Sequence, residues 1–195
     1  MKKSKFILSL ILGAIFISSC SKSNDENSTQ TSTSYEYLDA TSYTEWVYFS
    51  FMDKKIMTVK NPEKDLSWDI AFHRGDIRLN GGKSGIGQGK AVNTNTKDWN
   101  TEVKSPSTGF KTDEIGEITI EFTWSNIVTD KQAFSQTLGT WITIDTNNPP
   151  PVYTYNNWVY IVKTADGKDV KLQIYDYKDA KNQKGAFISF RYDFI

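Results

Sequence analysis

Short segments rich in aromatic and β-branched residues, each followed by turn-forming residues, recur along this chain and constrain its fold most strongly. The clearest lies in residues 67–74, where alternation places Trp68, Ile70 and Phe72 on one face of a strand and His73 on the other. No long segment shows helical periodicity. The pattern predicts an all-β fold, either an antiparallel sandwich or a partly closed barrel of many short strands.

Turn signals set the expected boundaries. The sequence Ala-Asp-Gly-Lys at 165–168 indicates a hairpin, and the prolines at 149–151 indicate a stiff extended loop. We expect a polar, irregular segment at 91–111, and a short helix near Lys131 to Phe134 within the ambiguous residues 125–138. The expected strands cover 45–51, 56–59, 68–74, 118–124, 139–145, 158–163, 170–177 and 186–195.

Five glycines in residues 81–89 require tight turning or close approach of the backbone. A phosphate-binding loop would need a glycine five residues before the Gly82-Lys83-Ser84 triplet, and that position is Ile77. No helical pattern follows either, so the sequence argues against a nucleotide site. A long glycine loop joining two strands is the favoured interpretation.

The N-terminal sequence is typical of an exported lipoprotein. Three lysines precede an apolar run at 6–17, which is too short to span a bilayer and suits a signal peptide. Ser18-Ser19-Cys20 follows, which predicts a signal peptide over 1–19, lipidation at Cys20 and anchoring to the membrane by acyl chains such as palmitate. An ordinary secretory signal with an incidental cysteine is the alternative.

Residues 20–34 are mostly Ser, Thr, Asn and Gln, a composition that predicts a disordered tether. Residues 35–195 are then expected to form a single β domain, long enough for a substantial core. Without residues 1–19 the chain holds 20 basic and 23 acidic residues, a balance that argues against nucleic acid as a partner.

Catalysis finds little support in the residue types. His73 is the only histidine, and no nucleophile motif surrounds it. We therefore interpret His73 as structural and expect that the protein is not an enzyme. A zinc site would need several His and Cys ligands, whereas the chain has one of each.

The motifs around residue 70 resemble the HmuY-type haem-binding lipoproteins of bacteria. The resemblance rests on Trp-Asp-Ile-Ala-Phe-His-Arg at 68–74 followed by Asn-Gly-Gly-Lys-Ser-Gly-Ile-Gly-Gln-Gly at 80–89, and it extends from about residue 37 to the end through 46–49, 150–154 and 163–192. It implies an all-β fold, haem capture for iron acquisition, and delivery of haem to a TonB-dependent outer-membrane receptor. With the predicted lipid anchor and the acidic Asp25-Glu26 after Cys20, we expect a location at the outer membrane, on the cell surface.

The family pattern of axial ligands is absent from this sequence. In the family, paired His or Met ligands come from the segment after a strand like 118–124 and from the loop before the prolines, whereas residues 125–151 here contain neither. Pro149 occupies a position where relatives often carry Met. No family ligand can therefore be transferred to this chain.

We expect haem in a groove bordered by residues 125–136 and 146–155, with Phe134, Tyr153, Tyr155, Pro149 and Pro150 as candidate ligand-binding residues. Three modes of binding stay open. A tyrosinate from Tyr153 or Tyr155 could coordinate ferric iron, Met52 and Met57 could meet across the turn between them, or the ring could be held by stacking alone.

A surface glycan-binding module is the competing function. The chain from residue 20 onward carries 25 aromatic residues, and exposed aromatic faces stack on sugars. Most of these rings would instead form the cores of two sheets if the chain is an ordinary β protein.

Overall fold

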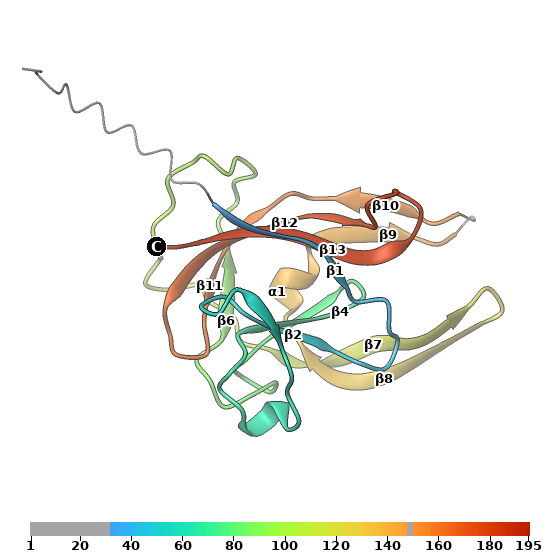
Figure 1. Cartoon of the computed structure of the whole chain (residues 1–195), viewed down its shortest axis with the longest axis horizontal. Helices are drawn as coiled ribbons and strands as arrows, with labels where there is room; N and C mark the ends of the chain where they lie inside the picture. Colours follow the sequence, from blue (N-terminus) through green and yellow to red (C-terminus); the bar gives the residue numbers. More distant parts are fainter. Residues whose placement is uncertain (1–31, 148–149) are drawn as a thin grey trace, which may run out of the picture. The chain divides into compact units, whose positions relative to one another are not determined.

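A computed structural model describes residues 32–147 and 150–195 of the chain. These residues form thirteen β-strands, one short α-helix and one 3-10 helix (Figure 1). The elements are β1 (Thr33–Asp39), β2 (Val47–Ser50), β3 (Lys55–Met57), η1 (Pro62–Lys64), β4 (Ile70–His73), β5 (Asp76–Leu79), β6 (Lys90–Asn93), β7 (Glu114–Thr123), β8 (Asn126–Phe134), α1 (Gln136–Gly139), β9 (Ile142–Asp145), β10 (Val152–Tyr155), β11 (Val159–Lys163), β12 (Asp169–Lys178) and β13 (Gly185–Phe194).

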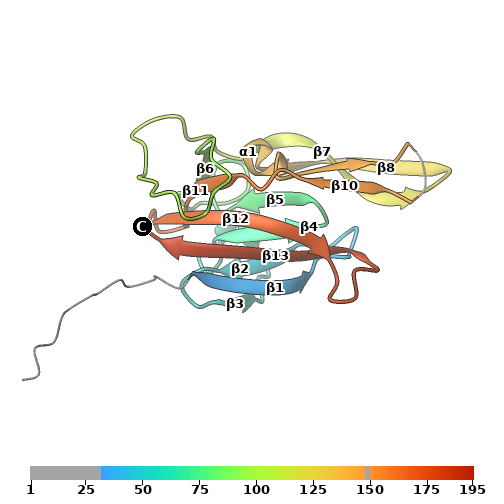
Figure 2. The ribbon, with the colours of Figure 1, turned by 90° about the horizontal axis from the view of Figure 1, so that it is seen from above.

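Two antiparallel sheets form the body of the domain, as the sequence predicts. The larger has the strand order β1-β13-β12-β11-β6 and the smaller has the order β3-β2-β4-β5 (Figure 2). Aromatic side chains from both sheets meet between them: the Phe72 ring of β4 stacks on Phe190 of β13, with centroids 5.1 Å apart, and the Phe49 ring packs edge-on against the same Phe190. The aromatic strands therefore form the core of a sandwich.

Two hairpins extend from the sandwich as arms. The β7–β8 arm and the β9–β10 arm each form a separate two-stranded sheet, and both point away from the end of the domain where β1 begins and the C-terminus lies (Figure 1). Hydrogen bonds join the base of the β7–β8 arm to β5, one beside the start of β7 and one beside the end of β8. The amide of Leu79 donates to Asp113 Oδ2 at 2.8 Å, and the amide of Ser135 donates to the carbonyl of Ile77 at 2.7 Å.

The segment around residues 125–138 differs from its prediction. Residues 131–134 belong to β8, because they pair with Glu114 to Glu117 of β7, and the expected helix there is wrong. The helix follows at Gln136–Gly139, where the Ser135 hydroxyl accepts the amide of Leu138 and caps the turn. Leu138 is fully buried, so the turn is fixed by packing as well as by its cap.

The strand boundaries shift by a few residues elsewhere. The first strand begins at Thr33, so the last two residues assigned to the tether pair with β13 instead. Lys90–Asn93 forms β6, at the start of the segment expected to be irregular. The hairpin at 165–168 is confirmed, because β11 and β12 pair across it.

The glycine run folds back on Asn80 at the end of β5. The Asn80 side chain donates to the carbonyls of Asp65 and Trp68 and accepts the amide of Gly87. A Cβ on Gly81 would lie 2.2 Å from the carbonyl oxygen of Gly89, so these backbones meet too closely for any side chain. The run is therefore a packed connection between β5 and β6.

The predicted signal peptide, Cys20 and most of the tether lie outside the described residues. Within residues 32–147 and 150–195, no helix is long and apolar enough to cross a membrane.

Candidate ligand cleft between the two hairpin arms

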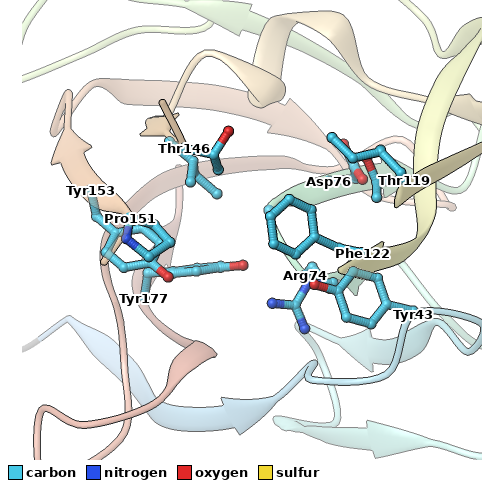
Figure 3. A pocket seen from close by; sticks show the side chains of 12 residues that line it. Tyr43, Arg74, Asp76, Thr119, Phe122, Thr146, Pro151, Tyr153 and Tyr177 are labelled. Atoms are coloured by element: carbon cyan, nitrogen blue, oxygen red, sulfur yellow. The ribbon is translucent and has the colours of Figure 1, made fainter. Parts of the chain in front are cut away.

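A cleft of about 340 Å³ lies between the two arms and the end of the sandwich (Figure 3). This is the lower part of the size range typical of ligand sites. The lining residues come from both arms and from the strands and loops of the sandwich next to them: Tyr43, Arg74, Gly75, Asp76, Thr119, Phe122, Ile127, Ile144, Thr146, Pro151, Tyr153 and Tyr177. The cleft includes residues from both segments expected to border a groove, 125–136 and 146–155.

Apolar side chains from the two arms line the outer part of the cleft. Phe122 and Ile127 come from the β7–β8 arm, and Ile144 and Pro151 come from the β9–β10 arm and its loop. Ile127 is 57% exposed and Ile144 is 38% exposed. Apolar side chains are left in water on facing arms, which favours an apolar ligand between them.

A polar group forms another part of the lining. The Arg74 guanidinium lies 3.9 Å above the ring of Tyr43, and its Nη1 donates to the carbonyl of Thr41 at 2.8 Å. Tyr177 lines the cleft from β12, and its hydroxyl points toward Arg74 (Figure 3). Asp76, the other charged lining residue, places Oδ2 3.5 Å from Nδ1 of His73.

The donors in the cleft limit how it could bind a metal. None of the described residues that line it is His, Met or Cys, so tyrosine is the only common axial ligand of haem there. Burial raises the pKa of Tyr153 and of Tyr177, although the charge of Arg74 lowers both in part. A tyrosinate at either position is therefore disfavoured at neutral pH in the free protein.

The structure separates the predicted ligand-binding residues. Tyr153 lines the cleft, and its ring packs against that of Tyr177 with centroids 5.1 Å apart. Tyr155 lies outside the cleft, stacked on buried Trp141 with centroids 6.4 Å apart, and burial together with the nearby Asp176 carboxylate raises its pKa to about 12. Phe134 covers Gly116 on β7.

The proline loop contributes Pro151 to the cleft, and not the expected Pro150. Pro151 lines the cleft, whereas Pro150 is exposed and is not part of the lining. Pro149 lies outside the described residues.

The remaining candidates lie away from the cleft. Met57 pairs with Tyr48 on β2, whereas Met52 is in the preceding turn and is 55% exposed, so the β2–β3 pairing does not place the two side chains opposite each other. His73 is 1% exposed, and its ring lies 5.1 Å from that of Trp46. His73 has a packed environment and does not line the cleft.

Sequence reasoning missed Tyr43, Arg74, Phe122 and Tyr177 as site residues. Arg74 is the last residue of the motif at 68–74 and directly follows β4, and its φ of 52° turns the chain there. Nothing in the neighbouring sequence indicates that its side chain reaches a cleft. Trp141 helps to fix this turn, because its Nε1 donates to the carbonyl of Gly75 at 2.9 Å. The cleft is assembled only by the long-range packing of the arms.

Comparison with known proteins connects this geometry to a family. Residues 42–192 match the model of the HmuY protein family. A structure from Bacteroides vulgatus, provisionally described as an HmuY-like heme-binding protein, superposes with a TM-score of 0.66 at 28% identity, covering 83% of this chain and 90% of that chain. A search of curated proteins finds no match.

Two further structures share the fold at lower identity. A Bacteroides fragilis protein provisionally described as a lipoprotein has a TM-score of 0.65 at 23% identity, covering 85% of this chain and 90% of that chain. The apo form of an HmuY analog from Tannerella forsythia has a TM-score of 0.67 at 22% identity, covering 84% of this chain and 95% of that chain.

Proposed function

The chain belongs to the HmuY family, and from this premise we propose that it binds haem in the cleft between its two hairpin arms. The family supplies the ligand class, and the B. vulgatus relative described as heme-binding supports it. The single observation that carries the proposal is the cleft itself, in which exposed Ile127 and Ile144 from opposite arms offer apolar surface to a flat ring. The protein acts as a binding protein and not as an enzyme.

Iron contributes little to binding in this proposal. The described lining holds no His or Met, and the raised pKa of Tyr153 makes tyrosinate ligation costly. We therefore expect the ring to be held by its apolar faces, mainly through Phe122, Ile127 and Pro151. Release of apolar surface from water supplies the driving force.

The position of the cleft suits a protein that captures haem at the cell surface and passes it to a TonB-dependent outer-membrane receptor. The strand β1, which starts the described domain, begins at the end opposite the arms (Figure 1). A lipid anchor on Cys20 and a short tether would attach that end to the membrane. Because the arms and the cleft lie at the other end of the domain, such an anchor would leave them accessible to a partner.

A haemin titration followed by absorption tests the proposal. The protein would be the mature chain from residue 20, with Cys20→Ala to remove the anchor. Ile127→Asp should weaken haemin binding about tenfold or more, because it places a charge against an apolar ring. Ile115→Asp is the matched control, since Ile115 is 53% exposed on the same arm but does not line the cleft.

Equal binding by Ile127→Asp and the parent protein would place haem elsewhere, and the absence of haemin binding by the parent would reject the proposal.

A further inference from the structure

Arg74 is held firmly at the cleft. Its backbone amide donates to the carbonyl of Ala40 at 3.0 Å, and its Nη1 donates to the carbonyl of Thr41 at 2.8 Å. The guanidinium also stacks over Tyr43 at 3.9 Å from the ring centroid. These contacts fix the position of the side chain and leave other donors of the five in a guanidinium for a ligand.

The charge of Arg74 is not neutralised by the described part of the protein. No described carboxylate lies within ion-pair distance of it; the close contacts of described carboxylates with basic side chains are with lysines and with the His73 ring. Asp76 also lines the cleft, but its Oδ2 lies 3.5 Å from the buried His73 Nδ1. An unpaired guanidinium beside apolar walls favours an anionic group on whatever enters the cleft.

Tyr177 adds a second donor aimed at the same space. Its side chain is 1% exposed, and its hydroxyl points into the cleft toward Arg74 (Figure 3). Burial raises the pKa of Tyr177, so the hydroxyl stays protonated and can donate. Arg74 and Tyr177 thus present donors of two kinds to one region, next to Phe122 and Tyr153.

We propose that this cleft recognises its ligand by a carboxylate, bound by Arg74 and the Tyr177 hydroxyl, and does not recognise a metal. This inference rests on the proposed function and narrows its ligand class to flat apolar rings with carboxylate side arms. An Arg–carboxylate pair is well suited to the task, because two parallel hydrogen bonds also fix the orientation of the ring.

Metal-free protoporphyrin and its dimethyl ester test the inference, because the ester keeps the ring and lacks the carboxylates. The mature chain with Cys20→Ala would be titrated with each compound in the same dilute detergent. We expect the acid to bind about 10- to 100-fold more tightly than the ester. Arg74→Gln should remove most of that difference by weakening only the acid, and Lys131→Gln, an equal charge change at an exposed position on β8, should leave it intact.

Pyrenebutyrate and pyrenebutanol form a second pair that separates the inference from the haem assignment. Preference for pyrenebutyrate that depends on Arg74, without binding of any porphyrin, would reject haem and support the carboxylate site. Equal binding of protoporphyrin and its ester would overturn the carboxylate site and leave porphyrin binding standing. Equal loss of acid and ester binding in Arg74→Gln would also overturn it, because that result indicates a structural role. If no porphyrin and no pyrene compound binds, both proposals fall.

Discussion

The ring of Tyr153 on β10 packs against the ring of Tyr177 on β12 at a centroid distance of 5.1 Å and an interplanar angle of 45°, although the two strands belong to different sheets. This contact joins the β9–β10 arm to the body of the sandwich. It also holds the ring of Tyr153 at the cleft, whereas Tyr155, two residues on, packs on Trp141 outside the cleft.

Phenylalanine substitutions at these two tyrosines separate stacking from iron coordination. We expect Tyr153→Phe to change haemin affinity by less than about threefold, because the ring that makes the contact is kept. Tyr155→Phe should have no effect, since the residue does not line the cleft. A large loss for Tyr153→Phe with haemin, but not with the metal-free ring, would show that a tyrosinate coordinates the iron.

His73 should support the fold and not the ligand. It is 1% exposed and packs against Trp46, so His73→Ala leaves a cavity and should lower the free energy of unfolding by about 2 kcal/mol or more. Haemin affinity should stay unchanged at a temperature where the variant is folded. Urea unfolding and a haemin titration measure the two quantities, and a folded variant that binds no haemin would contradict this role.

Asp113 should make stability depend on pH. Burial raises the pKa of this fully buried carboxyl from 3.8 to about 7, although hydrogen bonds from Ser84 and Leu79 oppose the shift. Between pH 4 and pH 7 the folded protein then holds a proton that the unfolded chain has lost. Stability contributed by this group is present at about pH 4 and is lost as the pH rises through 7, by on the order of 4 kcal/mol.

Asp113→Asn tests that dependence, because it keeps an oxygen for Leu79 and Ser84 and cannot ionise. Urea unfolding of both proteins from pH 4 to pH 8 should show the variant gaining stability relative to the parent as the pH rises. The same relative stability at every pH would show that Asp113 is ionised in the folded protein throughout this range.

Local signals predicted the sandwich well. Alternation around Ile70 and Phe72 marks strands that meet in the core, and Asp166-Gly167 marks a turn that needs no distant partner. The helix predicted at residues 131–134 is wrong because these residues form a strand only by pairing with residues 114–117 of β7, at the far end of the hairpin from its turn.

The cleft could be predicted only in part. Tyr153 and the two segments that border the cleft could be predicted. One segment follows the strand expected at 118–124, and the other contains the proline motif that holds Tyr153. Arg74 and Tyr177 are about a hundred residues apart in the sequence and meet only after the sandwich and both arms have formed. No sequence pattern predicts that these two residues line the same cleft.

Cys20 should carry the membrane anchor, a prediction that concerns residues outside the described structure. The order of charged, apolar and small residues before Cys20 motivates it. Cells producing the full chain should incorporate a palmitate analogue into the protein, and Cys20→Ala should abolish the labelling. Equal labelling of the two proteins would contradict lipidation at this residue.

The most direct test of the account compares haemin with metal-free protoporphyrin on the same mature chain with Cys20→Ala, by absorption and fluorescence titration. A cleft whose described lining lacks His, Met and Cys should bind both rings, with affinities within about threefold of each other. Strong binding of haemin alone would show that the iron is coordinated. Failure of both rings to bind at micromolar concentration would contradict the account, and binding of a glycan in their place would favour a sugar-binding surface protein.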